Sequence, residues 1–200
     1  MLTLLIDTAT DHVVVALADG ATVRDARSEP ARAQALPAIV EALLVANGLR
    51  PRDLDRIAVG IGPGAFTGLR IGVAFARGLA AALELELTPI STIATVARTA
   101  LDAAPADAVD VRAAVDARRG EWFVADARAA AGAIDVPYAT MSTAELDELG
   151  EPVIVRRGAP TPAALAALAV AAASLPADHV LPDYGREPDA VPGAFAGAPG

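Results

Sequence analysis

The chain contains no cysteine and no lysine, and it has only two histidines and four serines. The absence of cysteine excludes disulfides and thiol catalysis, and it agrees with a cytoplasmic location. All sixteen basic residues are arginine, so a Walker lysine, a Schiff base and a lysine general base are excluded. His12 and His179 are too far apart to form a metal-ligand pattern, and no serine stands in a G-x-S-x-G motif. Most hydrolase and transferase chemistries therefore lack their main residues.

Aromatic residues and long apolar runs are also scarce. Aromatic side chains make up 4% of the 200 residues although 54% are hydrophobic, so the core must rely on close contacts between small side chains. No apolar run reaches the roughly 18 residues of a membrane span, and the opening residues MLTLLIDTAT lack the basic region and cleavage site of a signal peptide. We expect no membrane contact. The net charge of −9 predicts weak binding to nucleic acid unless a partner supplies a basic surface.

The pattern of apolar residues predicts an α/β lobe in the first half of the chain, in the order β-β-β-α-β-α-β with a further helix at its end. Asp19-Gly20 predicts a hairpin turn, and Gly48 suits the end of a helix. The predicted strands are Leu2–Asp7, His12–Ala18, Ala21–Arg27, Ile57–Val59 and Leu87–Ser91, and the predicted helices are Ala31–Asn47, Gly68–Glu84 and Thr92–Leu101.

The opening pattern returns in the second half. Val111–Val115 is an apolar strand that ends in Asp116, and Trp122–Ala125 is a second one that Asp126 closes. We interpret this repeat as a diverged internal duplication, although strand-turn-strand units are common. A strand near Val153–Arg156 and a helix over Pro162–Ala173 follow. We predict an N-terminal lobe over residues 1–102, a C-terminal lobe over 103–181 and an irregular tail rich in Pro and Gly over 182–200.

A glycine-rich segment, GIGPGAFTGLRIG at residues 60–72, joins a predicted strand to a predicted helix. Such a turn usually holds an anion, and it formally fits the dinucleotide pattern G-x-G-x-x-[GA], with Gly62 and Gly64 as anion contacts. However, Pro63 removes one backbone donor, and Ser91 stands where the acidic ribose partner belongs. The alternative is a tight turn that lets a helix pack on a sheet.

The helix after this turn carries a stripe of small residues, because Gly68, Gly72, Ala76 and Ala80 recur at every fourth position. Such a stripe lets another helix approach closely. It predicts packing either on the helix at residues 31–47 of the same chain or on a second subunit. Arg70, at the start of the helix, could form a salt bridge across that interface or meet an anion.

Asp7 and Asp116 each end a predicted strand and begin a tight turn. In a duplicated fold they would face each other across a cleft, where two carboxylates could hold Mg²⁺ or orient a water. Thr8 and Thr10 could then contact a phosphate. The alternative is that each aspartate caps its own turn through its side chain.

Several of these segments together resemble the TsaB family, also called YeaZ. They are LLIDTATDHVVVAL, GIGPGAFTGLRIGVAFARGLA, VDARRGEWFVA and PDYGR, with LP-x-I at Leu36–Ile39. The resemblance implies the actin-like ATPase fold (ASKHA, ribonuclease H-like), an α/β fold of two duplicated lobes with mixed sheets flanked by helices. Two departures are PARAQA before Leu36, where the family often has a histidine, and a short second lobe.

The resemblance also implies a function. The chain would be a non-catalytic scaffold or dimerisation subunit that binds and activates TsaD, which forms N6-threonylcarbamoyladenosine next to the anticodon of tRNA. TsaE would join the complex, tRNA would be reached only through the complex, and the chain could form a homodimer when alone. No metal or tightly bound cofactor is implied, although ATP or ADP and Mg²⁺ could act at the level of the complex.

The family's N-lobe helices form its dimer contact, which implies an interface here at Leu36, Ile39, Val40, Leu43, Gly68, Arg70, Gly72, Ala76 and Ala80. The expected contacts for an anion or nucleotide are Asp7, Thr8, Thr10, Asp116, Gly62 and Gly64. A competing hypothesis is a free-standing actin-like ATPase or small-molecule kinase that uses Asp7 and Asp116 with Mg²⁺. A protease is disfavoured because the sequence has neither a metal-ligand pattern nor a serine motif.

Overall fold

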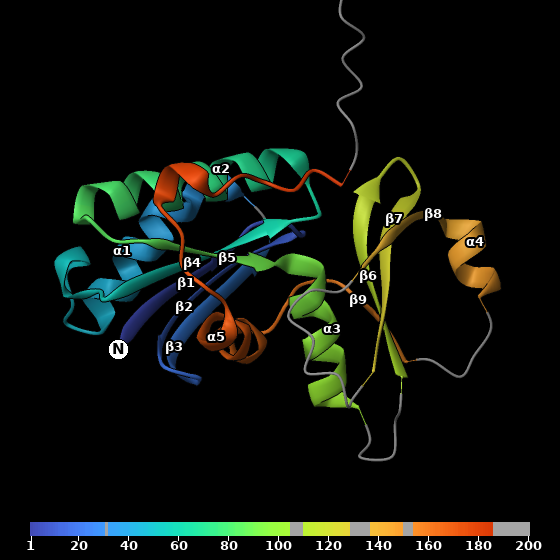
Figure 1. Cartoon of the computed structure of the whole chain (residues 1–200), viewed down its shortest axis with the longest axis horizontal. Coiled ribbons are helices and arrows are strands. Elements are labelled where there is room, and N and C mark those ends of the chain that lie inside the picture. Colours follow the sequence, from blue (N-terminus) through green and yellow to red (C-terminus); the bar gives the residue numbers. More distant parts are fainter. Residues whose placement is uncertain (31, 105–109, 129–136, 150–153, 186–200) are drawn as a thin grey trace, which may run out of the picture.

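The computed structural model describes residues 1–30, 32–104, 110–128, 137–149 and 154–185, which form two sheets with helices around them (Figure 1). The first sheet has the order β3-β2-β1-β4-β5. Its central strand β1 is buried along its whole length, as expected for a strand covered on both faces. The strands are β1 (Leu2–Asp7), β2 (His12–Asp19), β3 (Thr22–Pro30), β4 (Arg56–Gly62) and β5 (Leu87–Ser91).

The second sheet repeats the first with one strand fewer, in the order β8-β7-β6-β9. In both sheets the first strand pairs antiparallel with the second and parallel with the strand on its other side. This agreement confirms the predicted duplication. The strands are β6 (Asp110–Arg118), β7 (Glu121–Arg128), β8 (Ala139–Ser142) and β9 (Ile154–Arg157).

Helices begin and end where local signals place them. Gly48 follows α1 with a φ of 66°, and the Leu49 amide returns to the Leu44 carbonyl, which closes the helix as predicted. Ser142 and Glu145 form a capping box at α4. The helices are α1 (Leu36–Ala46), α2 (Phe66–Leu83), α3 (Thr92–Ala103), α4 (Thr143–Glu148) and α5 (Pro162–Ala171), with short 3-10 turns η1 (Ala33–Ala35), η2 (Pro51–Asp53) and η3 (Ala177–His179).

Two apolar layers cover the two faces of the first sheet. On one face, α1 and α2 pack on alternate strand residues such as Leu4 and Ile6. On the other face, Leu5 and Val14 contact α3 and α5. The alternation along β1 follows from the two-residue period of a strand. Since α2 is amphipathic, only one of its sides is used in this packing.

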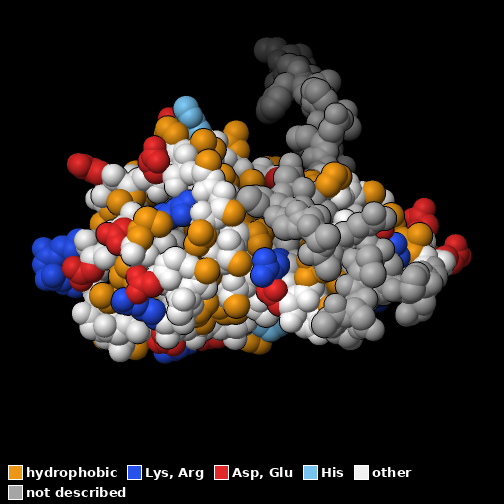
Figure 2. Space-filling model, turned by 60° about the horizontal axis from the view of Figure 1, so that its bottom comes forward, with side chains coloured by type: hydrophobic (Ala, Val, Ile, Leu, Met, Phe, Trp, Pro, Cys, Tyr) orange, Lys and Arg blue, Asp and Glu red, His pale blue; other side chains and the backbone are white. Residues whose placement is uncertain are grey.

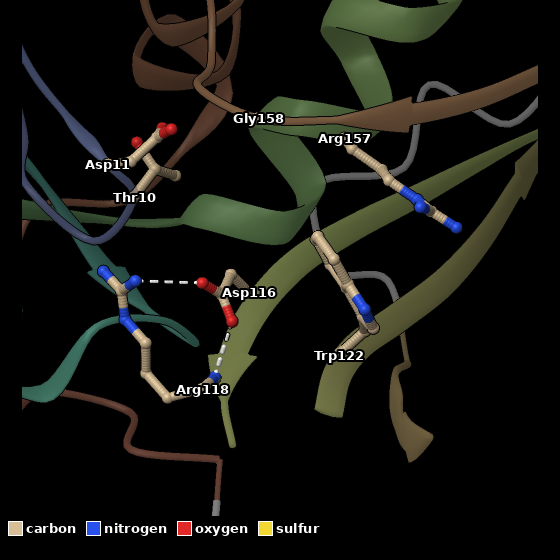
Figure 3. A pocket seen from close by; sticks show the side chains of 7 residues that line it. All are labelled: Thr10, Asp11, Asp116, Arg118, Trp122, Arg157 and Gly158. Atoms are coloured by element: carbon tan, nitrogen blue, oxygen red, sulfur yellow. Dashed lines mark hydrogen bonds and ion pairs between the residues drawn. The ribbon is translucent and has the colours of Figure 1, made fainter. Parts of the chain in front are cut away.

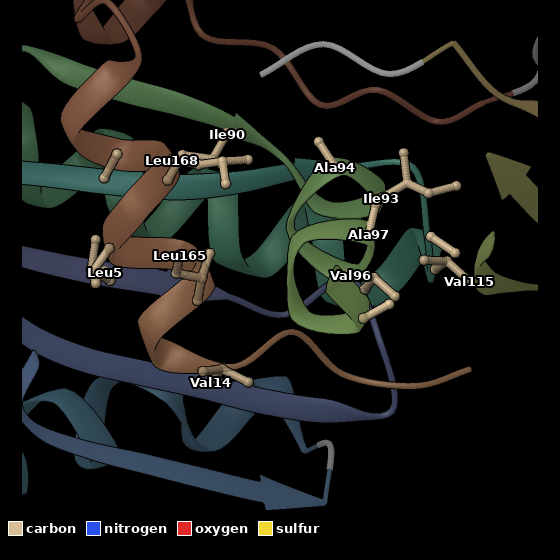
Figure 4. Packing of buried hydrophobic residues seen from close by; sticks show 14 of the residues in the cluster. Leu5, Val14, Ile90, Ile93, Ala94, Val96, Ala97, Val115, Leu165 and Leu168 are labelled. Atoms are coloured by element: carbon tan, nitrogen blue, oxygen red, sulfur yellow. The ribbon is translucent and has the colours of Figure 1, made fainter. Parts of the chain in front are cut away.

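The two lobes share helices rather than each keeping its own. α3 lies between the sheets in Figure 1, and α5, which follows β9 of the second sheet, packs on the first. Figure 4 shows Leu165 and Leu168 of α5 facing Leu5, Val14 and Ile90. One continuous cluster therefore runs through both lobes. The division of the chain at residues 102 and 181 stays a prediction.

The chain after α5 returns to the first lobe. Leu175 pairs with Leu87 at the edge of β5, and Val180 is buried among the residues under α1 and α2. Residues 182–185 continue along α2 (Figure 1), so the start of the predicted tail is packed. The rest of that tail, residues 186–200, lies outside the described residues. Val153, the predicted start of β9, also lies outside them.

We expect Leu165→Ala to destabilise both lobes together, because this fully buried side chain packs into their common cluster. Deleting it should cost about 3 kcal/mol of unfolding free energy. Urea denaturation followed by the fluorescence of Trp122, the only tryptophan, would report the loss from the second sheet. Val170→Ala is the matched control, since Val170 lies on the exposed side of α5 and should change the free energy by less than about 0.5 kcal/mol. Separate transitions for the two lobes would contradict a shared core.

Candidate functional site

Asp7 ends β1 and is fully buried. Its Oδ1 accepts a hydrogen bond from the Ala9 amide at 2.9 Å, and its Oδ2 accepts one from the Thr92 hydroxyl at 2.7 Å. Burial raises the pKa of Asp7 to about 6, and these two hydrogen bonds oppose that rise. One carboxylate oxygen therefore holds the β1–β2 turn, and the other ties that turn to the start of α3.

Asp116 occupies the same place at the β6–β7 turn. Its Oδ1 accepts a hydrogen bond from the Arg118 amide at 2.7 Å, two residues ahead, as Asp7 does with Ala9. The other oxygen meets the Arg118 guanidinium at 3.0 Å. The interpretation that each aspartate caps its own turn is confirmed. At both turns the aspartate accepts from the amide two residues later, and this shared spacing is further evidence of the duplication.

A cavity of about 260 Å³ lies between the two turns (Figure 3). Arg157 lies over the Trp122 ring, 5.0 Å from its centroid, and donates to Asp147 at 2.6 Å. The structure brings Thr10 and Asp116 together here. The lining residues are Thr10, Asp11, Asp116, Arg118, Trp122, Arg157 and Gly158.

The expectation that Asp7 and Asp116 face each other across this cleft is wrong. Asp116 lines the cavity, but Asp7 is buried behind the turn that it caps. Thr8 is also buried and donates to the Gly68 carbonyl at 2.8 Å. The sequence did not predict that Trp122 lines a cavity. The available signal was its position, because Trp122 comes just after the turn of the hairpin that repeats the first one.

The glycine-rich turn is a packing turn. The Gly62 amide donates to the Thr92 hydroxyl at 3.2 Å, and the Ala65 amide donates to the Ala9 carbonyl at 2.6 Å. A Cβ on Gly64 would meet the Ala9 backbone. The Gly62 and Ala65 amides are therefore used within the chain, and neither Gly62 nor Gly64 lines the cavity between the two turns. This occupation of the Gly62 amide disfavours Gly62 as an anion contact, and the assignment of Gly64 stays a prediction.

The small-residue stripe of α2 also packs inward. A Cβ on Gly68 would meet the Thr8 carbonyl, and one on Gly72 would meet the Thr8 hydroxyl. The first half of the stripe thus faces the β1–β2 turn, which neither predicted alternative named. Ala76 and Ala80 lie in the buried cluster that includes Leu36 and Val40 of α1, as packing within the chain predicts. The predicted interface is corrected for the residues that are buried inside the chain, because these side chains cannot reach a partner. They are Leu36, Val40, Leu43, Gly68, Gly72, Ala76 and Ala80.

The exposed residues of α1 and α2 differ from most of the predicted interface residues, and we call this exposed set the outer face. Val45 is 69% exposed and Phe66 is 56% exposed. Of the predicted interface residues, Arg70 belongs to this set and Ile39 is half-buried at its edge. The outer face consists of Pro37, Ala38, Glu41, Ala42, Val45 and Ala46 of α1 and of Phe66, Thr67, Arg70, Ala74, Gly78, Ala81 and Ala82 of α2.

The outer face is apolar enough to need an explanation. Both helices lie on the same side of the first sheet (Figure 1). By length and composition alone, α2 could cross a membrane, but a helix that covers a core passes the same test, and Leu69 and Val73 of α2 pack beneath it. Exposed apolar helix surfaces of this kind mark interaction sites.

Metal chemistry has little support in the described parts of the chain. Within them, no group of three or more His, Asp or Glu side chains is placed to hold a metal ion. The geometry defines a two-lobed protein of the actin-like class in which Asp7 is buried and committed to structure, whereas Asp116 lines the cavity.

Comparisons with known proteins agree with this class. The family described as tRNA N6-adenosine threonylcarbamoyltransferase matches residues 27–175. The protein TsaB for tRNA threonylcarbamoyladenosine biosynthesis from Escherichia coli (strain K12) is 40% identical over 126 residues, which cover 62% of this chain and 53% of that relative. An uncharacterized protein of Mycobacterium tuberculosis (strain ATCC 25618 / H37Rv) is 34% identical over 94% of this chain and 93% of its own.

The solved structure of YeaZ from Pseudomonas aeruginosa superimposes with a TM-score of 0.77 at 27% identity, covering 92% of this chain and 99% of that one. The chain therefore belongs to the TsaB/YeaZ family, and its actin-like fold is confirmed. The match spans about half the length of the Escherichia coli relative. The TsaB relatives place the family in the biosynthesis of threonylcarbamoyladenosine in tRNA.

We expect Gly72→Ala and Gly78→Ala to have opposite effects on stability. A Cβ at Gly72 would collide with Thr8, whereas a Cβ at Gly78 meets nothing within 4 Å. Gly72→Ala should therefore lower the unfolding free energy by more than about 1 kcal/mol, and Gly78→Ala should raise it by about 0.5–1 kcal/mol. Urea titrations of both variants would measure this. Equal effects would show that the stripe is not packed on the turn.

We expect Asp7 to make the fold less stable as pH rises. The pKa is raised in the folded state from an ordinary value of 3.8 to about 6, so this contribution is fully present below pH 3.8 and is lost as pH rises through 6. The loss is on the order of 3 kcal/mol. Asp7→Asn cannot ionise, so the unfolding free energy of the variant minus that of the wild type should rise between pH 4 and pH 6.5. A difference that stays constant over this range would contradict the assigned pKa.

Proposed function

We propose that this chain is a non-catalytic scaffold subunit that binds a TsaD-type subunit and activates it in the formation of N6-threonylcarbamoyladenosine in tRNA. One observation carries the proposal beyond family membership. Each Asp7 oxygen has a donor from within the chain, and the glycine-rich turn packs on the backbone of the adjoining β1–β2 turn. Neither feature is free for substrate chemistry, so we assign the function to an exposed surface.

The outer face of α1 and α2 is the surface that we assign to the partner. Its exposed apolar side chains, of which Val45 and Phe66 are the largest, suit a helix-to-helix contact. The small residues Ala74 and Gly78 between them let a second helix approach. When no partner is present, two copies of this chain could meet through the same face.

The charge distribution favours indirect contact with tRNA. Figure 2 shows one side of the molecule, where acidic and basic side chains are interspersed. Many arginines are neutralised by a neighbouring aspartate, which leaves little basic surface in the described parts for a phosphate backbone. These pairs include Arg24–Asp19, Arg27–Asp25, Arg50–Asp53, Arg98–Asp102, Arg112–Asp126, Arg118–Asp116 and Arg157–Asp147.

The partner subunit would therefore supply most of the grip on tRNA. TsaE would join the same complex, and ATP or ADP with Mg²⁺ would act there rather than as a tightly bound cofactor of this chain. A cytoplasmic location remains the prediction from sequence.

The second candidate is a free-standing actin-like ATPase or small-molecule kinase. The cavity favours it, because Thr10, Asp116 and Arg118 meet there between the lobes. It would have to work without Asp7, which does not reach the cavity. Mg²⁺-dependent hydrolysis of ATP by the chain alone would support this alternative.

We expect Val45→Asp to abolish the complex with the TsaD-type subunit of the same organism and to leave the chain folded. A carboxylate at this exposed position costs the monomer little, but it would be buried without a partner charge in the complex. Size-exclusion chromatography with light scattering would measure assembly, and transfer of the threonylcarbamoyl group to tRNA would measure activation.

Val170→Asp is the matched control, because Val170 is 52% exposed on α5, away from the outer face. It should assemble and activate like the wild type. A wild-type chain that forms no complex would overturn the proposed function. A Val45→Asp variant that still binds would overturn only the assignment of the face.

A further inference from the structure

The short segment Pro182–Gly185, here called the clasp, is tied to both lobes. The Asp183 amide donates to the Ile61 carbonyl in the glycine-rich turn at 2.6 Å. The Tyr138 hydroxyl, which enters from the second lobe just before β8, lies 2.9 and 2.8 Å from the two Asp183 carboxylate oxygens. Burial, followed by the Asp183 carboxylate, raises the pKa of Tyr138, so this phenol stays a donor at neutral pH. Asp183 thus bridges the lobes.

The far end of the clasp, at Gly185, is also fixed by contacts within the chain. The Gly185 amide donates to Asp183 Oδ1 at 2.9 Å. Gly185 has a φ of 67°, and a Cβ there would meet the ring of Phe123 in β7. That ring packs edge-on against Tyr138, with 5.7 Å between centroids. The residue between these two anchors, Tyr184, is therefore held in a defined place.

Tyr184 reaches the outer face at the start of α2. Its ring lies 4.9 Å from the Phe66 ring between centroids, and the Arg70 guanidinium lies 5.2 Å from the centroid of the same Phe66 ring. The three side chains form a column, Tyr184–Phe66–Arg70. Beside it lies a groove of about 390 Å³, lined by Phe66, Thr67, Arg70, Ile71 and Ala74.

Arg70 differs in its charge balance from the arginines of this chain that pair with an aspartate. Among the described residues, no carboxylate forms an ion pair with it, whereas seven other arginines pair with an aspartate. Arg70 is an exposed cation above an aromatic ring and lies next to an apolar groove. A complementary partner would place an apolar side chain in the groove and a carboxylate beside the cation. Arginine and tyrosine are also the residue types that most often dominate binding energy.

We propose that the column Tyr184–Phe66–Arg70 extends the docking face of α2, and that Arg70 takes a carboxylate of the TsaD-type partner subunit. Asp183 and Tyr138 act as positioning residues, because they hold Tyr184 against Phe66 without touching the partner. The C-terminal clasp thereby makes the docking face depend on both lobes. This inference rests on the proposed function and names contact residues for it.

The test measures the affinity of the full chain for the TsaD-type subunit of the same organism, at low and high salt. Arg70→Met keeps the length of the side chain and removes its charge, and it should weaken binding about tenfold at low salt. The deficit should shrink at high salt, because the lost interaction is electrostatic and screened. Tyr184→Ala should weaken binding about tenfold at both salt concentrations, and Tyr184→Phe, which keeps the ring, should bind like the wild type.

Arg98→Met on α3 is the matched control, since it removes an exposed helical arginine away from this surface and should leave the affinity unchanged. Thermal melts of all variants would exclude unfolding as the cause of a loss. If the wild type binds and both Arg70→Met and Tyr184→Ala bind within about twofold of it, the inference is overturned while the proposed function stands. If these variants impair only self-association of the chain, the occupant is a second copy, which also overturns it. A wild type that does not bind at all overturns the proposed function itself.

Discussion

The close contact between the β1–β2 turn and α2 is the constraint on which the rest of this structure depends. Thr8 donates its hydroxyl to the Gly68 carbonyl, and the absence of side chains at Gly68 and Gly72 lets α2 sit directly on that turn. The turn itself is held by Asp7, whose buried carboxyl accepts from Ala9 and Thr92. A larger residue at either glycine would push the helix off the sheet.

This contact decides which parts of the first lobe remain available. Together with Thr92 of α3, it uses the Gly62 and Ala65 amides and both oxygens of Asp7, and such groups could otherwise meet a phosphate or a metal. It also fixes the rotation of α2, so that Phe66, Arg70 and Ala74 point outward. The same packing that uses these groups within the first lobe thus leaves exposed the outer face that we propose for docking.

Local patterns in the sequence predicted the elements well, because strands and caps depend on neighbouring residues. The bounds of Leu2–Asp7 and Leu87–Ser91 agree with the structure, and the repeated strand-Asp-turn pattern correctly predicted the duplication. β8 was missed because its four residues, ATMS, are too short and polar to show a period. The capping box of Ser142 and Glu145 was the available signal for the helix that follows.

Long-range contacts could not be predicted in the same way. A four-residue spacing of small residues says that something approaches α2 closely, but not that it is Thr8, sixty positions earlier. Nor does any local pattern in α5 show that it leaves its own sheet to pack on Leu5 and Val14. Most of the predicted interface residues are therefore buried inside the chain in the structure, whereas Arg70 is exposed.

The shared helices connect this packing to the docking face. Because α3 and α5 bury side chains from both sheets in one cluster, a change in the angle between the lobes would have to open that cluster. The Asp183–Tyr138 hydrogen bonds join the lobes a second time, where residues 182–185 meet Tyr138, which packs against the same cluster. A change in the angle between the lobes would therefore disturb both sets of contacts. Two sets of contacts between the lobes limit their relative movement, and a preorganised pair of lobes suits the docking role proposed above.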